Sequence, residues 1–294
     1  VTSPFLPDAS ATITVLGGAA AKFQITGQGT TVAGGLTNVT VSTFDMYDNF
    51  ASEYTGTVAF GSSDAQAELP AQYTFTTADA GSHTFALRLK TAGNQTIQAH
   101  DISNAGFNGN SGNILVTPAA AASLSLNGGG GFIGSVNAVT ITAKDAFGNA
   151  ATGYSGLVHL SSSDASSITS GDAALVNGVG TFTVQPMTLG QQTLTATDVT
   201  DNTVGGSSVI DVTPGWGVRL AMSSIASTVG AGQTQSTTVT VYDSFGNVST
   251  VFTGWIVVSF IWVWCSMCIC VVYPVIESWK ALVEVGKGVW GDVM

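Results

Sequence analysis

The chain has 294 residues, enough for two or three domains of ordinary size that each bury a core of their own. Only 9% of the residues are charged, and 18 acidic against 7 basic residues give a net charge of -11, which excludes nucleic acid as a partner because phosphate binding needs clustered Lys and Arg. All 3 cysteines lie between Cys265 and Cys270, so disulfides cannot stabilise the chain before them.

Residues 19–118 are predicted to be a first repeat built of short strands. In Val39-Thr40-Val41-Ser42 apolar and polar residues alternate, which is the pattern of a half-buried strand. Asp48-Asn49 favours a turn, and Val116-Thr117-Pro118 closes the unit because proline cannot extend a strand ladder. Short strands separated by turns in a unit of this size predict an immunoglobulin-like β-sandwich.

Residues 1–18 carry the pattern of the same closing strand. Ile13-Thr14-Val15 alternates as the end of the first repeat does. We therefore interpret residues 1–18 as the closing strand of a preceding repeat, and we expect the array to begin before Val1.

Residues 119–214 repeat the first unit closely. Asp145-Ala146-Phe147-Gly148-Asn149 matches a segment that begins at Asp45, and a third copy begins at Asp243, at spacings of 100 and 98 residues. Two further motifs recur after it: Tyr54-Thr55-Gly56, Tyr154-Ser155-Gly156 and Phe252-Thr253-Gly254, and then Ser62-Ser63-Asp64 and Ser162-Ser163-Asp164. The sequence predicts tandem sandwiches joined at short proline-containing links.

These motifs resemble the bacterial immunoglobulin-like repeats of the invasin and intimin type. The resemblance covers residues from about 19 to 254. It implies an all-β fold of tandem immunoglobulin-like domains, a place on the cell surface or outside the cell, and repeats that extend a functional tip. It implies no particular ligand.

Residues 215–254 are predicted to be a truncated third repeat, and residues 255–294 an atypical apolar tail. Trp255 to Tyr273 carries no charge, and five of the six Trp lie beyond Gly254. Three interpretations stay open: a shifted reading frame, a membrane helix, because 19 such residues meet the length criterion, and an unusual buried segment. The nucleotide sequence of this region would decide between them.

Two groups of residues formally match sites for chemistry, and both have simpler interpretations. Gly129 to Gly134 fits the dinucleotide-binding glycine pattern, but the following residues alternate as a strand where that site needs a helix, so we predict a turn. The three histidines, His83, His100 and His159, share neither metal-ligand spacing nor equivalent repeat positions. We expect no catalytic and no cofactor-binding residues.

Aspartates that recur between repeats are the remaining candidates. They form three sets: Asp45, Asp145 and Asp243; Asp64 and Asp164; Asp101 and Asp198. We interpret them as residues that cap turns. Calcium near the domain junctions is the alternative, since calcium prefers several carboxylate oxygens together. The recurring aromatics Tyr54, Tyr154 and Phe252 are expected to pack in the core or at a corner of the sandwich.

The function expected from these features is structural and adhesive, without enzymatic activity. Such a module would form an extracellular stalk that holds a distal domain away from the cell surface and meets a surface protein or glycan. A carbohydrate- or protein-binding module and the spacer repeats of a large secreted enzyme are the alternatives. Contact with a membrane is expected only if residues 255–273 are a genuine membrane segment.

Overall fold

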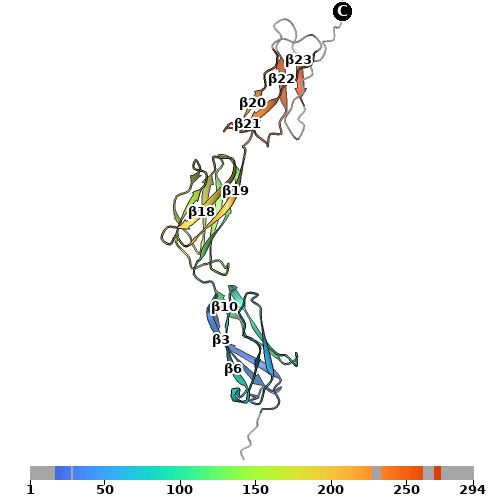
Figure 1. The fold of residues 1–294 in the computed structure, drawn as a ribbon, viewed down its shortest axis with the longest axis vertical. Coiled ribbons are helices and arrows are strands. Elements are labelled where there is room, and N and C mark those ends of the chain that lie inside the picture. The colour runs from blue at the N-terminus through green and yellow to red at the C-terminus, as the bar shows by residue number, and fades with distance from the viewer. Residues whose placement is uncertain (1–16, 28, 227–232, 261–267, 273–294) are drawn as a thin grey trace, which may run out of the picture.

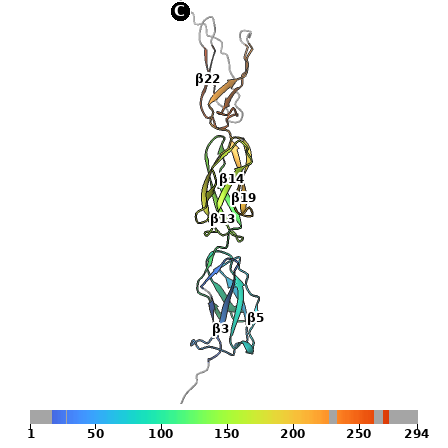
Figure 2. The same cartoon turned by 90° about the vertical axis from the view of Figure 1, so that its left-hand side faces the viewer.

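Three β-units follow one another end to end in the structure, a computed structural model that describes residues 17–27, 29–226, 233–260 and 268–272. The units form a linear array (Figure 1), and a view turned by 90° shows the same succession (Figure 2). The described residues contain β-strands and one short 3-10 helix, η1 (Thr77–Asp79). The predicted all-β fold class is confirmed.

The first unit is a β-sandwich. In one layer β1 (Lys22–Gly27), β3 (Leu36–Phe44) and β6 (Ser82–Arg88) pair antiparallel in the order β1-β3-β6. The other layer holds the sheets β5-β4-β8-β9 and β2-β10-β7. Its strands are β2 (Thr30–Val32), β4 (Thr57–Ser62), β5 (Tyr73–Thr74), β7 (Gly93–Gln95), β8 (Ile97–Asp101), β9 (Asn108–Asn110) and β10 (Ile114–Thr117).

The second unit repeats this plan with the sheets β11-β13-β17-β15 and β12-β19-β18-β14-β16. The strand β12 pairs parallel with β19, as β2 pairs with β10 in the first unit. The strands are β11 (Ser123–Gly128), β12 (Gly131–Phe132), β13 (Asn137–Lys144), β14 (Leu157–Ser162), β15 (Ile168–Thr169), β16 (Ala173–Ala174), β17 (Val179–Gln185), β18 (Gly190–Asp198) and β19 (Gly205–Thr213).

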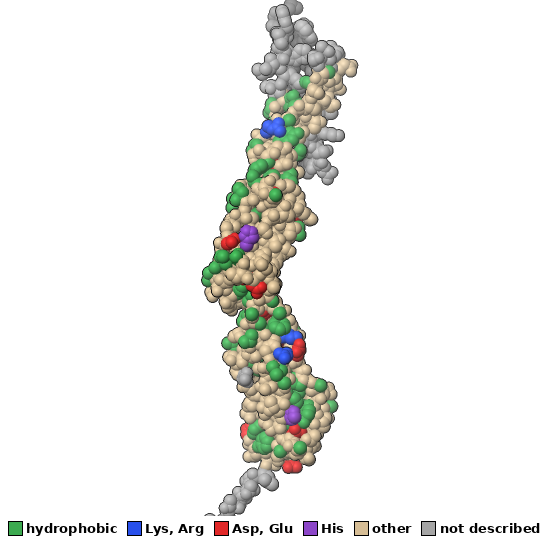
Figure 3. All heavy atoms as spheres, turned by 60° about the vertical axis from the view of Figure 1, so that its left-hand side comes forward, with side chains coloured by type: hydrophobic (Ala, Val, Ile, Leu, Met, Phe, Trp, Pro, Cys, Tyr) green, Lys and Arg blue, Asp and Glu red, His purple; other side chains and the backbone are tan. Residues whose placement is uncertain are grey.

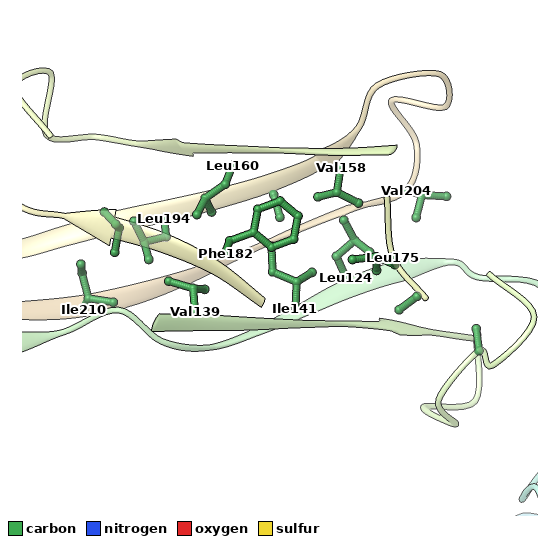
Figure 4. Close-up of a cluster of buried hydrophobic side chains, with 14 of the residues drawn as sticks. Leu124, Val139, Ile141, Val158, Leu160, Leu175, Phe182, Leu194, Val204 and Ile210 are labelled. Atoms are coloured by element: carbon green, nitrogen blue, oxygen red, sulfur yellow. The ribbon is translucent and has the colours of Figure 1, made fainter. Parts of the chain in front are cut away.

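Alternation along the strands builds a separate core in each of these two units. Val39 and Val41 on β3 and Val139 and Ile141 on β13 are at most 1% exposed, as the period-2 pattern predicts. In the second unit Phe182 lies between side chains of both layers (Figure 4). Each such side chain contributes about 1.5–3 kcal/mol through burial, so each unit has the means to fold on its own core.

The third unit has only part of this plan. Its strands β20 (Arg219–Met222) and β21 (Val239–Tyr242) pair antiparallel as β1 and β3 do. Leu220 and Met222 stand where Phe23 and Ile25 stand in the first unit, yet they are 51% and 48% exposed against 5% for each of the latter. The layer that would cover them is incomplete among the described residues.

The start of the predicted tail contains two strands. Ile256–Phe260 form a strand, β22, at the place that β4 and β14 occupy after the recurring glycine, and β22 pairs antiparallel with β23 (Cys268–Val272). A membrane helix over residues 255–273 does not match these two strands, and β-branched Ile256, Val257 and Val258 explain the preference for a strand. The other residues of the predicted tail lie outside the described ones.

In the described ranges, no helix combines the length and the apolar character needed to cross a bilayer.

Candidate functional site: the junctions between units

A loop that begins at Asp145 ties the linker from the first unit to the body of the second. The Oδ1 atom of Asp145 accepts hydrogen bonds from the backbone N–H groups of Phe147 and Asn149, both at 2.9 Å. Its Oδ2 atom accepts one from the N–H of Ala119 in the linker, at 3.0 Å. The carboxylate is buried, so the linker and the loop are held together by charge-assisted bonds.

The other two copies have the same geometry. The Oδ2 atoms of Asp45 and Asp243 accept the N–H groups of Gly18 at 2.8 Å and Gly215 at 3.0 Å. The fourth loop residue adopts a left-handed backbone in all three copies, with φ of 69° at Asp48, 85° at Gly148 and 86° at Gly246. Glycine suits this conformation, which accounts for its place in two of the three motifs.

An aromatic side chain from this loop sits on the neighbouring unit. Phe147 packs against the hydrophobic core cluster of the first unit. Its ring lies over Gly34, where a Cβ atom would come within 2.5 Å of Cε2 of Phe147. Phe245 lies over Gly134 in the same way at the second junction. Both glycines have a φ of 74° and lie in turns. We call each glycine turn that an aromatic ring covers the seat of that ring.

At the first junction a two-point hydrogen bond reinforces this contact. The side chain of Asn149 donates from Nδ2 to the backbone oxygen of Lys90 at 2.7 Å and accepts at Oδ1 from the N–H of Ala92 at 2.9 Å. The ammonium group of Lys90 lies 5.7 Å from the centre of the Phe147 ring. At the second junction, the described hydrogen bonds of Asn247 stay within its own loop.

A second recurring aspartate supports the segment on which Asn149 docks. Asp64 accepts hydrogen bonds from the N–H groups of Lys90 at 2.6 Å and Thr91 at 2.9 Å. In the second unit Asp164 accepts from Met187 at 2.7 Å and Thr188 at 2.9 Å. These carboxylates therefore fix the backbone groups at the end of one unit that faces the next.

The third set of aspartates pairs with the recurring tyrosines. The hydroxyl group of Tyr54 donates to Asp101, and that of Tyr154 donates to Asp198. Burial, and then the hydrogen bond to the carboxylate, raises the pKa of each tyrosine. The predicted corner role of the tyrosines thus includes a polar contact that the sequence did not show. Phe252 has no hydroxyl group, and it lies over Gly254 as Tyr154 lies over Gly156.

Hydrogen bonds hold the aspartates ionised. The bond from the N–H of Gly18, helped by those from Asn49 and Tyr47, lowers the pKa of Asp45 to about 2. For Asp145 and Asp164 burial opposes ionisation, but the hydrogen bonds outweigh it and lower the pKa.

A pH dependence follows from these shifts. Because the carboxylates bind protons more weakly in the folded than in the unfolded chain, their stabilisation is present above the unfolded pKa of about 3.9 and is lost as the pH falls towards about 2. We expect the free energy of unfolding to be level between about pH 7 and pH 5 and to fall steeply below about pH 4. Urea titrations across this range measure it, and equal midpoints at pH 3 and pH 7 would contradict the assignment.

The other candidate residues lie apart from the junction contacts. His83 on β6 contacts Asp79, His159 on β14 contacts Asp172, and His100 lies exposed on β8. In the part of the chain that the structure describes, no three His, Cys, Asp or Glu side chains gather as metal ligands do. Hydrogen bonds account for the recurring acids, and calcium at the junctions stays a prediction to be tested by calorimetric titration.

The glycine-rich segment Gly129 to Gly134 forms a turn and the short strand β12, with no helix after it. The sequence predicted the turn but not its contact with the next unit, in which the ring of Phe245 covers Gly134. The equivalent of Gly134 in the first unit, Gly34, was the available signal.

Fold and junctions together define a tandem immunoglobulin-like repeat protein. No protein-family model matches the sequence, and no curated protein matches it. Among solved structures, the chain is similar to FdeC, an Escherichia coli adhesin, at 19% identity over 83% of this chain and 80% of that one, with a TM-score of 0.41. It is similar to invasin, a bacterial integrin-binding protein, at 15% identity over 81% of this chain and 50% of that one, with a TM-score of 0.37.

A further match is the D0-D1 domain of intimin, at 13% identity over 64% of this chain and 97% of that one, with a TM-score of 0.27. A β-glycosidase from Bacteroides vulgatus matches at 14% identity over 65% of this chain and 24% of that one, with a TM-score of 0.31. At these identities and TM-scores, the four likenesses concern the fold alone.

Proposed function

We propose that the chain is a structural and adhesive stalk module of an extracellular repeat protein, which projects a distal domain from the cell surface and catalyses no reaction. The observation that carries this proposal is the built junction between the first two units. Domains joined by a bare linker move freely by default, whereas here a ring, a two-point hydrogen bond and a pinned linker join them.

The surface supports the same proposal. On the face shown in Figure 3, Lys and Arg side chains are few and form no broad basic patch. A stalk needs length, stiffness and solubility more than a concentrated binding surface, and a net charge of -11 favours solubility. A surface protein or glycan is the proposed partner of the whole protein.

Loosening the junction tests this proposal. In the full chain, Phe147→Ala combined with Asn149→Ala removes the ring and the two-point bond. We expect the distribution of distances between spin labels at the exposed positions Gln24 and Ser125 to broaden at least about twofold, because interdomain motion is then unrestrained. Labels carried by non-natural residues avoid the cysteines at 265–270.

The matched control is Tyr47→Ala combined with Asn49→Ala, the equivalent positions of the first unit. These side chains do not touch the second unit, so the distance distribution should keep its width. A distribution that is already broad in the unaltered chain, or that Phe147→Ala and Asn149→Ala leave unchanged, would argue against a stiff stalk.

A further inference from the structure

The loop from Asp45 to Asn49 has the internal geometry of the two junction loops. The Oδ1 atom of Asp45 accepts hydrogen bonds from the N–H groups of Tyr47 at 2.8 Å and Asn49 at 2.9 Å. The linker N–H of Gly18 and the left-handed Asp48 complete the pattern described above. The first unit thus presents a preformed copy of the docking loop.

This copy differs from the others in what covers it. The aromatic residue of the loop is half-buried at the first junction, and Phe245 is 46% exposed at the second. Tyr47, in the same position, is 76% exposed, and Met46 beside it is 71% exposed. Asn49 is also exposed, and among the described residues its Oδ1 atom accepts no hydrogen bond, whereas that of Asn149 accepts the N–H of Ala92.

The two occupied loops show which surface fits such a loop. In both, the ring covers a glycine with a φ of 74°. That glycine lies in the turn after β2 or β12, the strand that pairs parallel with the last strand of its unit, β10 or β19. In the first, a backbone oxygen and an N–H two residues apart meet the asparagine. A flat glycine turn with these groups beside it is the end of an immunoglobulin-like unit of this repeat.

We propose that the loop Asp45–Asn49 is a docking surface for the glycine-turn end of another unit of this repeat type, one that precedes Gly17 in the same chain. Tyr47 covers the glycine of that unit, and the side chain of Asn49 meets its backbone. The hydroxyl group of Tyr47, absent from Phe147 and Phe245, reaches the rim of the contact. This proposal rests on the proposed stalk function and extends it to a third junction.

Chemical modification of Tyr47 tests the docking. The probe chain carries a copy of residues 119–213 in place of residues 1–16. Gly17 then directly follows the copied Thr213, in the position that Pro214 has after Thr213 in the chain itself. Tyr47 is nitrated with tetranitromethane and quantified by mass spectrometry in the full chain and in the extended chain. We expect nitration to slow by roughly 1.7-fold in the extended chain, in line with the ratio of the exposed fractions of Tyr47 and Phe245, 76% and 46%.

Two further measurements keep the outcome clear. Gly134→Ala in the inserted copy places a Cβ in the seat and should return Tyr47 to its original rate, while calorimetry shows that the copy is folded. An equal rate in the full and extended chains, with a folded copy, would overturn the docking. If that happens while the distances between Gln24 and Ser125 stay narrow, only the third junction fails; if those distances are broad, the proposed stalk fails.

Discussion

Asp164→Ala destabilises the second unit by about 3 kcal/mol, because it removes a buried carboxylate that accepts several charge-assisted hydrogen bonds. The carboxylate is 5% exposed and accepts hydrogen bonds from the N–H groups of Ser166, Met187 and Thr188 and from the Thr188 hydroxyl group. In a unit of this size the loss lowers the unfolding midpoint by about 12 °C or more. Calorimetry, with amide hydrogen exchange to assign the transition to residues 119–214, measures it.

Asp211→Ala is the matched control for this change. Asp211 lies on β19 of the same unit, carries the same charge and is exposed, so its removal should alter the midpoint little. The unfolding midpoint of Asp164→Asn should lie between those of the two alanine variants, since the amide oxygen of asparagine can still accept hydrogen bonds while its nitrogen cannot. If Asp164→Ala and Asp211→Ala lower the midpoint equally, the carboxylate of Asp164 does not organise the end of the unit.

The equivalent change in the first unit bears on the junction, because Asp64 holds the segment that faces the second unit. Asp64 has this position at the first junction, where Lys90 and Ala92 offer their backbone groups to Asn149. A loss of order in that segment would remove the partner of Asn149 without touching Asn149 itself. The recurring aspartates thus link the stability of one unit to the rigidity of its junction with the next unit.

The sequence predicted the sandwich because its two main signals are local. Alternation around Val39 and Val139 reports the face of a strand directly, and the recurrence of Asp45, Asp145 and Asp243 reports a turn that needs a carboxylate. Both signals need only neighbouring residues to be interpreted. The tail stayed open for the same reason, since an apolar run satisfies the criterion for a membrane helix and that for a buried strand alike.

The junction escaped prediction because half of it has no side-chain signal. Asn149 binds a backbone oxygen and a backbone N–H, which every residue except proline supplies in the same form. Gly134 was predicted only as part of a turn, Gly34 belongs to none of the recognised motifs, and only the fold brings the rings of Phe147 and Phe245 onto these two glycines. The pairing of Tyr54 with Asp101 was hidden likewise, although both residues had been recognised as recurrent.

Gly156→Ala is expected to destabilise the second unit by about 3 kcal/mol and to disrupt the bond between Tyr154 and Asp198. A Cβ atom at this position would lie 2.5 Å from Cζ of Tyr154 and would also meet the Asp198 carboxylate. The tyrosine is packed against the core, so it cannot move away without leaving buried groups unpaired, and overpacking alone costs about 1–3 kcal/mol.

Gly153→Ala separates this effect from that of losing any glycine in the loop. A Cβ atom at Gly153 meets nothing within 4 Å, so this variant should keep the midpoint of the parent chain. The spectroscopic pKa of Tyr154, which burial and Asp198 now raise, should move towards its ordinary value in Gly156→Ala and stay raised in Gly153→Ala. Equal midpoints for the two variants would mean that the close approach of Tyr154 does not require a glycine at position 156.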